Sequence, residues 1–278
     1  METETITQDI VVLRDMDERS VLVCGKRYTT AIDLPTRLES LSSLLVTSRD
    51  LTPEGLRTAI LTHEPVGLAE NLHGIRGVQL MRGDRKPDED WDWDDVPPEL
   101  LELPQVPVHV VRHPQTLHDD AGRAFHVEPC LGSAASLAVI VEPEELLVCC
   151  DDLDPVLPPR IHPGRVHETL MRLQDWRLRA PRIVVPASGR PITGDQVPEM
   201  FDRCIEYVRS LYQRTRTGLT ESRLPWERLV YMIPANTLWP VEGASRPVLD
   251  RHRDNVRQMA LDIFQRVQGE AEEVSIAP

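Results

Sequence analysis

Short apolar runs alternate with turn residues along the first quarter of the chain, and this pattern predicts β-strands. The runs are rich in β-branched residues and are bounded by charged or glycine-containing segments; they are Ile10–Leu13, Val21–Cys24, Tyr28–Ile32 and Arg57–Leu61. Between the last two, Leu38, Leu41 and Leu45 recur at helical spacing. The region therefore predicts strands, a helix and a further strand, in that order.

The second half of the chain shows the same kind of pattern, with apolar strand segments and helices. Further strands are predicted at Val106–Val111, Ala135–Val141, Leu146–Cys150 and Arg182–Val185. Apolar positions at helical spacing predict helices over Arg165–Leu178 and Val197–Tyr212, and a final amphipathic helix around Val256–Val267. Groups of strands alternating with helices indicate a layered α/β fold.

The length and the net charge of the chain limit the kinds of protein that it can be. The 278 residues suffice for one large core, since a domain of about 200–250 residues plus an extension is reasonable at this length. The net charge of −14 opposes binding to nucleic acid or to an anionic membrane, because both need a basic surface. The acidic start lacks the basic-then-apolar order of a signal peptide, and five scattered cysteines suit reduced thiols. We therefore expect a cytoplasmic protein without a disulfide framework.

An acidic segment interrupts the pattern between Lys86 and Pro98. Six of the eight residues 88–95 are acidic, so we expect a solvated loop or flap. Trp91 and Trp93 within it either cover a pocket or anchor the loop on the nearest surface.

Four segments, in order along the chain, resemble the landmarks of the metallo-β-lactamase superfamily. Ile60-Leu-Thr-His-Glu-Pro-Val-Gly-Leu68 stands where that family has Thr-His-x-His-x-Asp-His. Glu128-Pro-Cys-Leu-Gly-Ser133 is similar to Pro-Gly-His-Thr-x-Gly-Ser, Val148-Cys-Cys-Asp-Asp-Leu153 to Gly-Asp-x-Leu, and Val185-Pro-Ala-Ser-Gly-Arg-Pro191 to Pro-Gly-His-Gly-x-Pro. The resemblance covers about residues 10–215. It implies a four-layer αββα sandwich over residues 1–215, with residues 216–278 as a helical C-terminal extension packed on it.

Several positions of the family's metal-binding motifs carry other residues in this chain, and this changes the chemistry that we expect. Of seven positions that ligate two metals in the family, the resemblance matches two to ligand residues here, His63 and Asp151. The other five are Pro65, Gly67, Leu68, Pro129 and Ser188. Proline, glycine and leucine have no donor side chain, and a serine hydroxyl is a poor zinc ligand. Since even loss of a supporting partner costs about 10–100-fold in metal affinity, we expect no dinuclear centre and no other cofactor.

If the fold is as the resemblance implies, the vacated corner becomes a small-molecule pocket. The candidate catalytic residues are His63, Asp151 and Ser188, and the candidate substrate-binding residues are Pro65, Leu68, Pro129 and Cys130. The first three form either a serine nucleophile, base and orienter, or an acid–base pair without covalent chemistry. In a third alternative, these residues have no catalytic role and only stabilise the loops. A helix predicted to begin at Gly67 would offer its free N–H groups to an anion.

A relocated metal site is a separate possibility. His113, His118, Asp119, Asp120 and His126 occur in one stretch, and imidazoles with carboxylates suit zinc or iron. His113 and His118 are expected to flank a hairpin turn, so the alternative is a plain polar hairpin.

Three functions follow from these alternatives. The first is a metal-independent cyclase, lyase or isomerase acting on a small anionic or carbonyl-bearing substrate, with His63 and Asp151 transferring a proton. The second is a catalytically inactive binding or scaffold protein, and the third is a hydrolase that uses Ser188 or a relocated metal. The expected partner is a small-molecule substrate. The helical extension, whose His252-Arg-Asp-Asn255 is similar to a motif of related sequences, would wall the pocket or dock a second copy or a partner enzyme.

Overall fold

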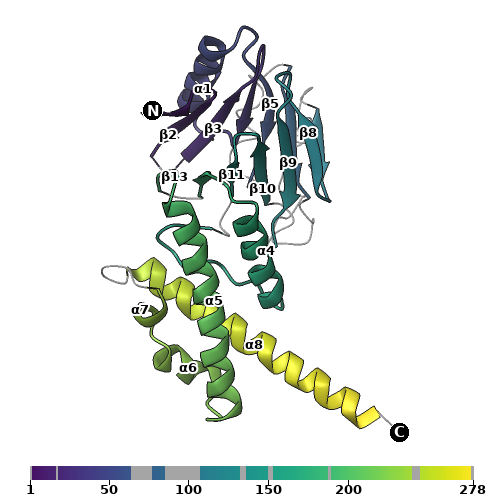
Figure 1. The fold of residues 1–278 in the computed structure, drawn as a ribbon, viewed down its shortest axis with the longest axis vertical. Coiled ribbons are helices and arrows are strands. Elements are labelled where there is room, and N and C mark those ends of the chain that lie inside the picture. Colours follow the sequence, from purple (N-terminus) through teal and green to yellow (C-terminus); the bar gives the residue numbers. More distant parts are fainter. Residues whose placement is uncertain are drawn as a thin grey trace, which may run out of the picture. The chain divides into compact units, whose positions relative to one another are not determined.

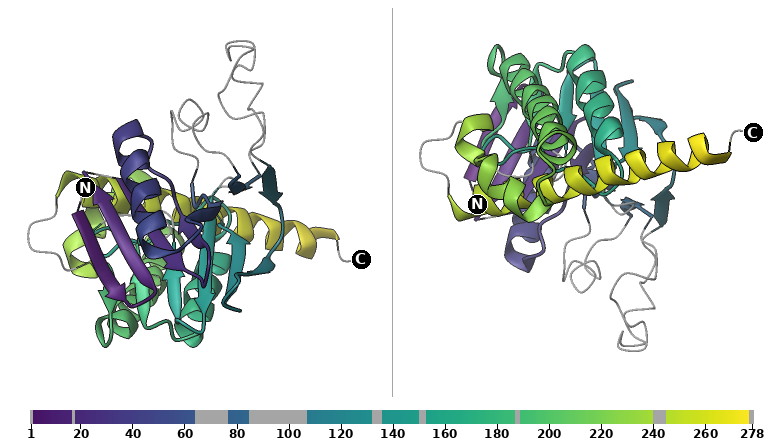
Figure 2. Two further views of the ribbon diagram at one scale, coloured as in Figure 1. Left: turned by 90° about the horizontal axis from the view of Figure 1, so that it is seen from above. Right: turned by 90° about the horizontal axis from the view of Figure 1, so that it is seen from below.

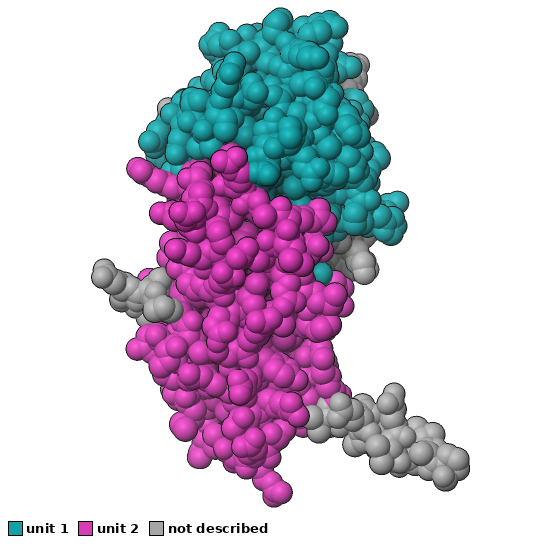
Figure 3. All heavy atoms as spheres, in the orientation of Figure 1, with its two compact units in different colours: residues 1–150 teal, residues 151–278 magenta. Residues whose placement is uncertain are grey.

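The protein forms two compact units, residues 1–150 and 151–278 (Figure 3). A computed structural model describes residues 2–16, 18–63, 77–84, 107–131, 136–149, 153–186, 189–239 and 245–276, the last ten of these by backbone alone.

The first unit contains a seven-stranded sheet whose strands follow one another in chain order. They are β1 (Glu2–Thr7), β2 (Ile10–Asp15), β3 (Glu18–Cys24), β4 (Thr29–Ile32), β5 (Leu56–Ile60), β6 (Gln79–Gly83) and β7 (Val108–Val111). The pairs from β1 to β4 are antiparallel, whereas β4 to β7 run parallel. The carboxyl ends of the parallel strands therefore meet at one edge, where open α/β sheets place their sites.

Helix α1 (Leu38–Leu51) covers one face of this sheet (Figure 1). Leu41 and Leu44 are fully buried against residues of the strands, whereas Leu38 is exposed. The buried face of the helix therefore contains Leu44, whereas the sequence predicted Leu38 there. Full burial of each leucine contributes about 1.5–3 kcal/mol, and this packing fixes the strands that carry the site.

The same unit holds four strands of a second sheet, in the order β11-β10-β9-β8. They are β8 (Gln115–His118), β9 (Ala124–Pro129), β10 (Leu137–Glu142) and β11 (Leu146–Val148), and all pairs are antiparallel. The expected hairpin turn between His113 and His118 was wrong, because most of that interval is β8. The turn lies at residues 119–123, where Gly122 has a φ of +89° that suits glycine.

The second unit is mainly helical. It contains α4 (Val166–Leu178), the antiparallel pair β12 (Ile183–Val185) and β13 (Ile192–Thr193), α5 (Gln196–Thr220), α6 (Trp226–Met232), α7 (Ala235–Leu238) and α8 (Arg246–Ile276). Helices α5 and α8 pack against each other and cross (Figure 2). The expected boundary at 215/216 falls inside α5 and stays a prediction. None of the helices described is both long enough and apolar enough to cross a membrane.

A buried polar network joins α5 to α8. The Tyr207 hydroxyl donates to Nδ1 of His252 at 3.0 Å, and Nε2–H of His252 donates to the Ile233 carbonyl at 2.6 Å. Asn255 donates to the Tyr207 oxygen at 3.1 Å and accepts from the Ile161 N–H at 3.0 Å. Burial lowers the pKa of His252, in keeping with a neutral ring that donates at one nitrogen and accepts at the other. The His-x-x-Asn motif thus holds the interior of this unit together.

Candidate functional site

The sequence landmark at His63 lies at the carboxyl end of β5. Its backbone is fixed from several sides: Leu61 N–H donates to the Met81 carbonyl at 2.8 Å, and Leu137 N–H of the second sheet donates to the Thr62 carbonyl at 2.7 Å. Asp33, which directly follows β4, donates its N–H to the Ile60 carbonyl at 2.8 Å. Parallel pairing of β4 with β5 therefore brings Asp33 and Thr62 together.

Asp33 is the buried anchor of this corner, with 4% of its surface exposed. Its carboxylate accepts both the N–H and the hydroxyl of Thr62, each at 2.7 Å. Its backbone has a φ of +64°, a left-handed conformation that aspartate and asparagine adopt more readily than other non-glycine residues. Both carboxylate oxygens are thus directed at the residue that precedes His63.

His63 lies beside this carboxylate with 58% of its side chain exposed. Its Nδ1 is 3.6 Å from Oδ1 of Asp33 and 3.2 Å from Oγ1 of Thr62. The Thr62 hydroxyl has one hydrogen and gives it to Asp33, so its oxygen can only accept from His63. The hydrogen-bond network therefore assigns the ring hydrogen to Nδ1 in the neutral form. Nε2 is left with a lone pair that can take a proton or bind a metal.

Asp33 was missed by the sequence analysis, which paired His63 with Asp151. A signal was present, because Asp33 is an acidic residue immediately after the predicted strand Tyr28–Ile32. Carboxyl ends of neighbouring parallel strands share an edge, so a carboxylate there belongs with the site. The predicted order of strand, helix and strand favours parallel neighbours, but it does not show which side chains at the shared edge touch.

The other predicted site residues are described only in part. Pro129 ends β9, and its ring offers no donor atom. Cys130 follows with 6% of its surface exposed, and its N–H donates to the Ser136 carbonyl at 2.8 Å. Outside the described residues lie Pro65, Gly67, Leu68, Asp151 and Ser188, together with Trp91 and Trp93 of the acidic segment. That His63, Asp151 and Ser188 meet at one corner stays a prediction.

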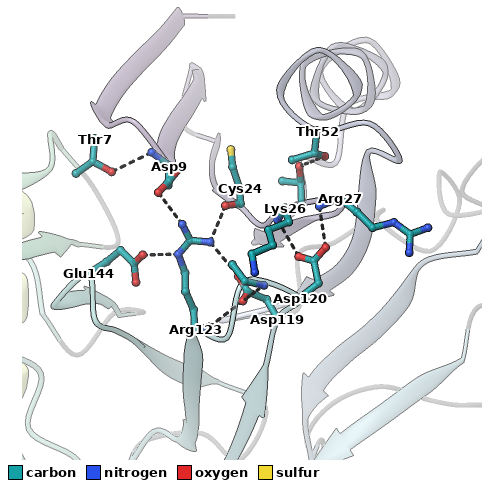
Figure 4. Close-up of polar contacts among 12 residues, drawn as sticks. Thr7, Asp9, Cys24, Lys26, Arg27, Thr52, Asp119, Asp120, Arg123 and Glu144 are labelled. Carbon is teal, nitrogen blue, oxygen red and sulfur yellow. Dashed lines mark hydrogen bonds and ion pairs between the residues drawn. The ribbon is translucent and has the colours of Figure 1, made fainter.

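The residues considered for a relocated metal site form hydrogen bonds with other groups of the protein. Oxygens of Asp120 accept the backbone N–H groups of Lys26 at 2.9 Å and Arg27 at 2.7 Å (Figure 4). His126 contacts Oγ1 of Thr116 at 2.9 Å and lies 3.4 Å from a Glu142 oxygen. Within the described ranges, no three histidine, cysteine or acidic side chains are grouped so that they could hold a metal ion.

Arg123, the last residue of the turn between β8 and β9, connects the two sheets of the first unit. Its guanidinium binds Asp9 at 2.6 Å, Asp119 at 3.2 Å and the Cys24 carbonyl at 2.7 Å, and it also pairs with Glu144 (Figure 4). The residue is 8% exposed, so these contacts compensate a charge that would be costly to bury alone. The acidic residues of this turn therefore stabilise the β8–β9 hairpin and its contacts with neighbouring segments.

Comparison with known proteins supports the fold. No family model matches the sequence, and no curated protein does so either. An inverting sec-alkylsulfatase from Pseudomonas sp. has a similar structure, at 12% identity and a TM-score of 0.65, over 93% of this chain and 49% of the sulfatase. The chain therefore spans about half the length of that relative.

Two metallo-β-lactamase structures match over nearly their whole length. A family protein from Thermus thermophilus is 16% identical with a TM-score of 0.59, and 95% of each chain is covered. A metallo-β-lactamase from Pontibacter korlensis is 13% identical with a TM-score of 0.53, over 75% of this chain and 98% of that one. Such low identities show the fold alone. The predicted fold class is confirmed: this chain has the metallo-β-lactamase fold with a helical C-terminal extension.

Proposed function

We propose that this chain is a small-molecule enzyme that works without a metal, using His63 for proton transfer in a cyclase, lyase or isomerase step. One observation carries the proposal: the imidazole is 58% exposed while its Nδ1 faces the buried carboxylate of Asp33. A histidine held in one tautomer, with its other nitrogen accessible, has the arrangement of a general base.

The donor set argues against the metal chemistry of the fold family. At the positions that the resemblance matches to metal ligands, proline, glycine and leucine replace imidazole and carboxylate, and Pro129 is the described example. These residues do not fit a dinuclear centre, since zinc sites are built from cysteine, histidine and carboxylate side chains. No step of the proposed reaction passes through a metal.

In the proposed step, Nε2 of His63 takes a proton from a substrate atom next to a carbonyl group or from a hydroxyl. The ring then becomes an imidazolium whose Nδ1–H faces Asp33 and Thr62. Asp33 contributes by fixing the tautomer of the neutral ring, which leaves Nε2 as the nitrogen that accepts the proton.

Asp151 and Ser188 keep their predicted roles within this proposal. The family resemblance predicts that they belong to the same site as His63, where Asp151 would orient the substrate or the imidazole. Ser188 would donate a hydrogen bond to a carbonyl oxygen that gains charge in the transition state. A mostly apolar lining by Pro65, Leu68 and Pro129 would exclude water from the reacting group.

The test is exchange of hydrogen for deuterium next to a carbonyl. Chelator-treated protein is incubated in D₂O with a panel of small ketones and keto acids, and deuterium uptake is followed by NMR. His63→Gln should slow the uptake by about 100-fold or more, the usual contribution of a general base. The matched control is His167→Gln on α4, an exposed histidine that should leave the rate unchanged.

Three results would overturn the proposal. Stoichiometric zinc in the purified protein, with exchange that stops on chelation, would restore the metal chemistry of the family. Exchange that persists unchanged in His63→Gln would remove this residue from the reaction. Binding of panel compounds without any exchange would favour the scaffold function over the enzyme.

A further inference from the structure

A second hollow lies inside the first unit, toward the amino ends of β4 and β5. It has a volume of about 170 Å³ and opens between the first sheet and the β8–β9 hairpin. Its apolar walls are Ile60, Leu117 and Phe125. Asp33, Thr62 and His63 are not among the residues that line it, so this hollow is separate from the candidate catalytic corner.

The polar lining of the hollow carries charges of both signs, and Arg57 is the cation among the lining residues. Asp119 and Asp120 border it, but backbone N–H groups and Arg123 already bind their oxygens (Figure 4). Arg57 also borders it, and its guanidinium carbon lies 5.7 Å from the Tyr28 ring centroid. In the part of the chain that the structure describes, the Arg57 guanidinium donates a hydrogen bond to the Gly77 carbonyl at 3.3 Å and has no carboxylate within ion-pair distance.

Size and chemistry together select a class of ligand. A cavity of about 150 Å³ lined by apolar side chains accepts one benzene ring, so this hollow has room for one ring-sized apolar body. Thr30 and Thr58 add hydroxyl groups to the lining, and His118 also borders the hollow. A guanidinium presents paired N–H donors that match a carboxylate.

We propose that this cavity binds a small aromatic carboxylate, a ligand of the size and charge of benzoate. The ring lies between Phe125, Leu117 and the Tyr28 ring, and the carboxylate lies against Arg57 and the threonine hydroxyls. This site is distinct from the His63 corner and does not depend on the reaction proposed there. An enzyme and a catalytically inactive scaffold could equally carry it.

Benzoate and benzyl alcohol are suitable probes, because they share a ring and differ in charge. Titration calorimetry with the full chain should show saturable binding of benzoate. Arg57→Gln should weaken benzoate by about tenfold or more, since hydrogen bonds to charged groups contribute about 1.5–3 kcal/mol, and should leave benzyl alcohol unchanged. Arg112→Gln is the matched control: this exposed arginine pairs with Asp84 at 2.9 Å and does not border the hollow.

Amide chemical shifts locate the ligand without any substitution. Benzoate should shift the N–H signals of Thr30, Thr58 and Phe125 more than that of His63. Lack of saturable binding would overturn the proposal, and so would equal losses in Arg57→Gln and Arg112→Gln or largest shifts at His63. Because none of these measurements uses catalysis, their failure is distinguishable from failure of the proposed reaction.

Discussion

Replacing Asp33 by asparagine should reverse the tautomer of His63. The substitution keeps the shape of the side chain and suits the left-handed backbone, where φ is +64°. The Thr62 N–H can donate only, so the asparagine oxygen must stay opposite it, where Oδ1 now accepts at 2.7 Å. The asparagine NH₂ group then faces Oγ1 of Thr62 in place of Oδ2, an acceptor at 2.7 Å.

This exchange redirects the hydrogen bonds of the corner. Oγ1 of Thr62 must accept from the new NH₂ group, so the hydroxyl hydrogen turns to Nδ1 of His63, 3.2 Å away. Nδ1 becomes an acceptor, and the ring hydrogen moves to Nε2. The accessible nitrogen is then a donor in the neutral ring, and the proposed base is lost while all side chains remain in place.

The cost in stability follows from the same two hydrogen bonds. Bonds to a charged group contribute about 1.5–3 kcal/mol, against about 1 kcal/mol for neutral pairs. Loss of the charge from both hydrogen bonds should therefore cost about 2 kcal/mol. With a urea dependence of about 1–3 kcal/mol per molar, the midpoint of unfolding should fall by about 1 M.

Two measurements check the prediction against a matched control. The nitrogen NMR signals of the imidazole report which nitrogen carries the hydrogen, and urea unfolding reports the stability. Asp50→Asn on α1 is the control, because Asp50 is exposed. If the ring hydrogen stays on Nδ1 in Asp33→Asn, or if the midpoint moves no more than in Asp50→Asn, Asp33 does not set the tautomer.

Two further predictions concern other parts of the protein. Burial lowers the pKa of His252, so the unfolded chain binds its proton first; stability should be complete above about pH 6.5 and decline as the pH falls below that value, with a slope of at most about 1.4 kcal/mol per pH unit. Urea midpoints at several pH values should show the decline, and an unchanged slope in His252→Gln would contradict this origin. Gly25→Ala should cost about 1–3 kcal/mol, because an added Cβ would overlap an oxygen of Asp120 and lie 2.7 Å from the Tyr28 carbonyl oxygen. A wild-type melting temperature for Gly25→Ala would show that the turn yields easily.

The strands that the sequence predicted are those with their own apolar pattern. Residues 10–13 and 21–23 are buried and rich in valine and isoleucine, so local composition was enough. The first strand, Glu2–Thr7, was missed because it is polar and mostly exposed, and it is held by antiparallel pairing with β2. Strands β6, β8 and β9 were missed as well. Their pairing with neighbouring strands defines them more than their composition does.

The candidate site likewise has one part that the sequence predicts and another that only the tertiary structure shows. The sequence by itself determined the fold class and pointed to His63, because the spacing of four segments is a property of the chain. Through the resemblance it also predicts that the matched positions lack most metal donors, since the residue types are read directly from the chain. Only the tertiary structure decided that Asp33, thirty residues earlier, contacts His63 and sets its ring hydrogen. The reason is that the crossover through α1 places β4 and β5 side by side in parallel, and the pattern along the chain does not record which side chains will touch at the edge that these strands share.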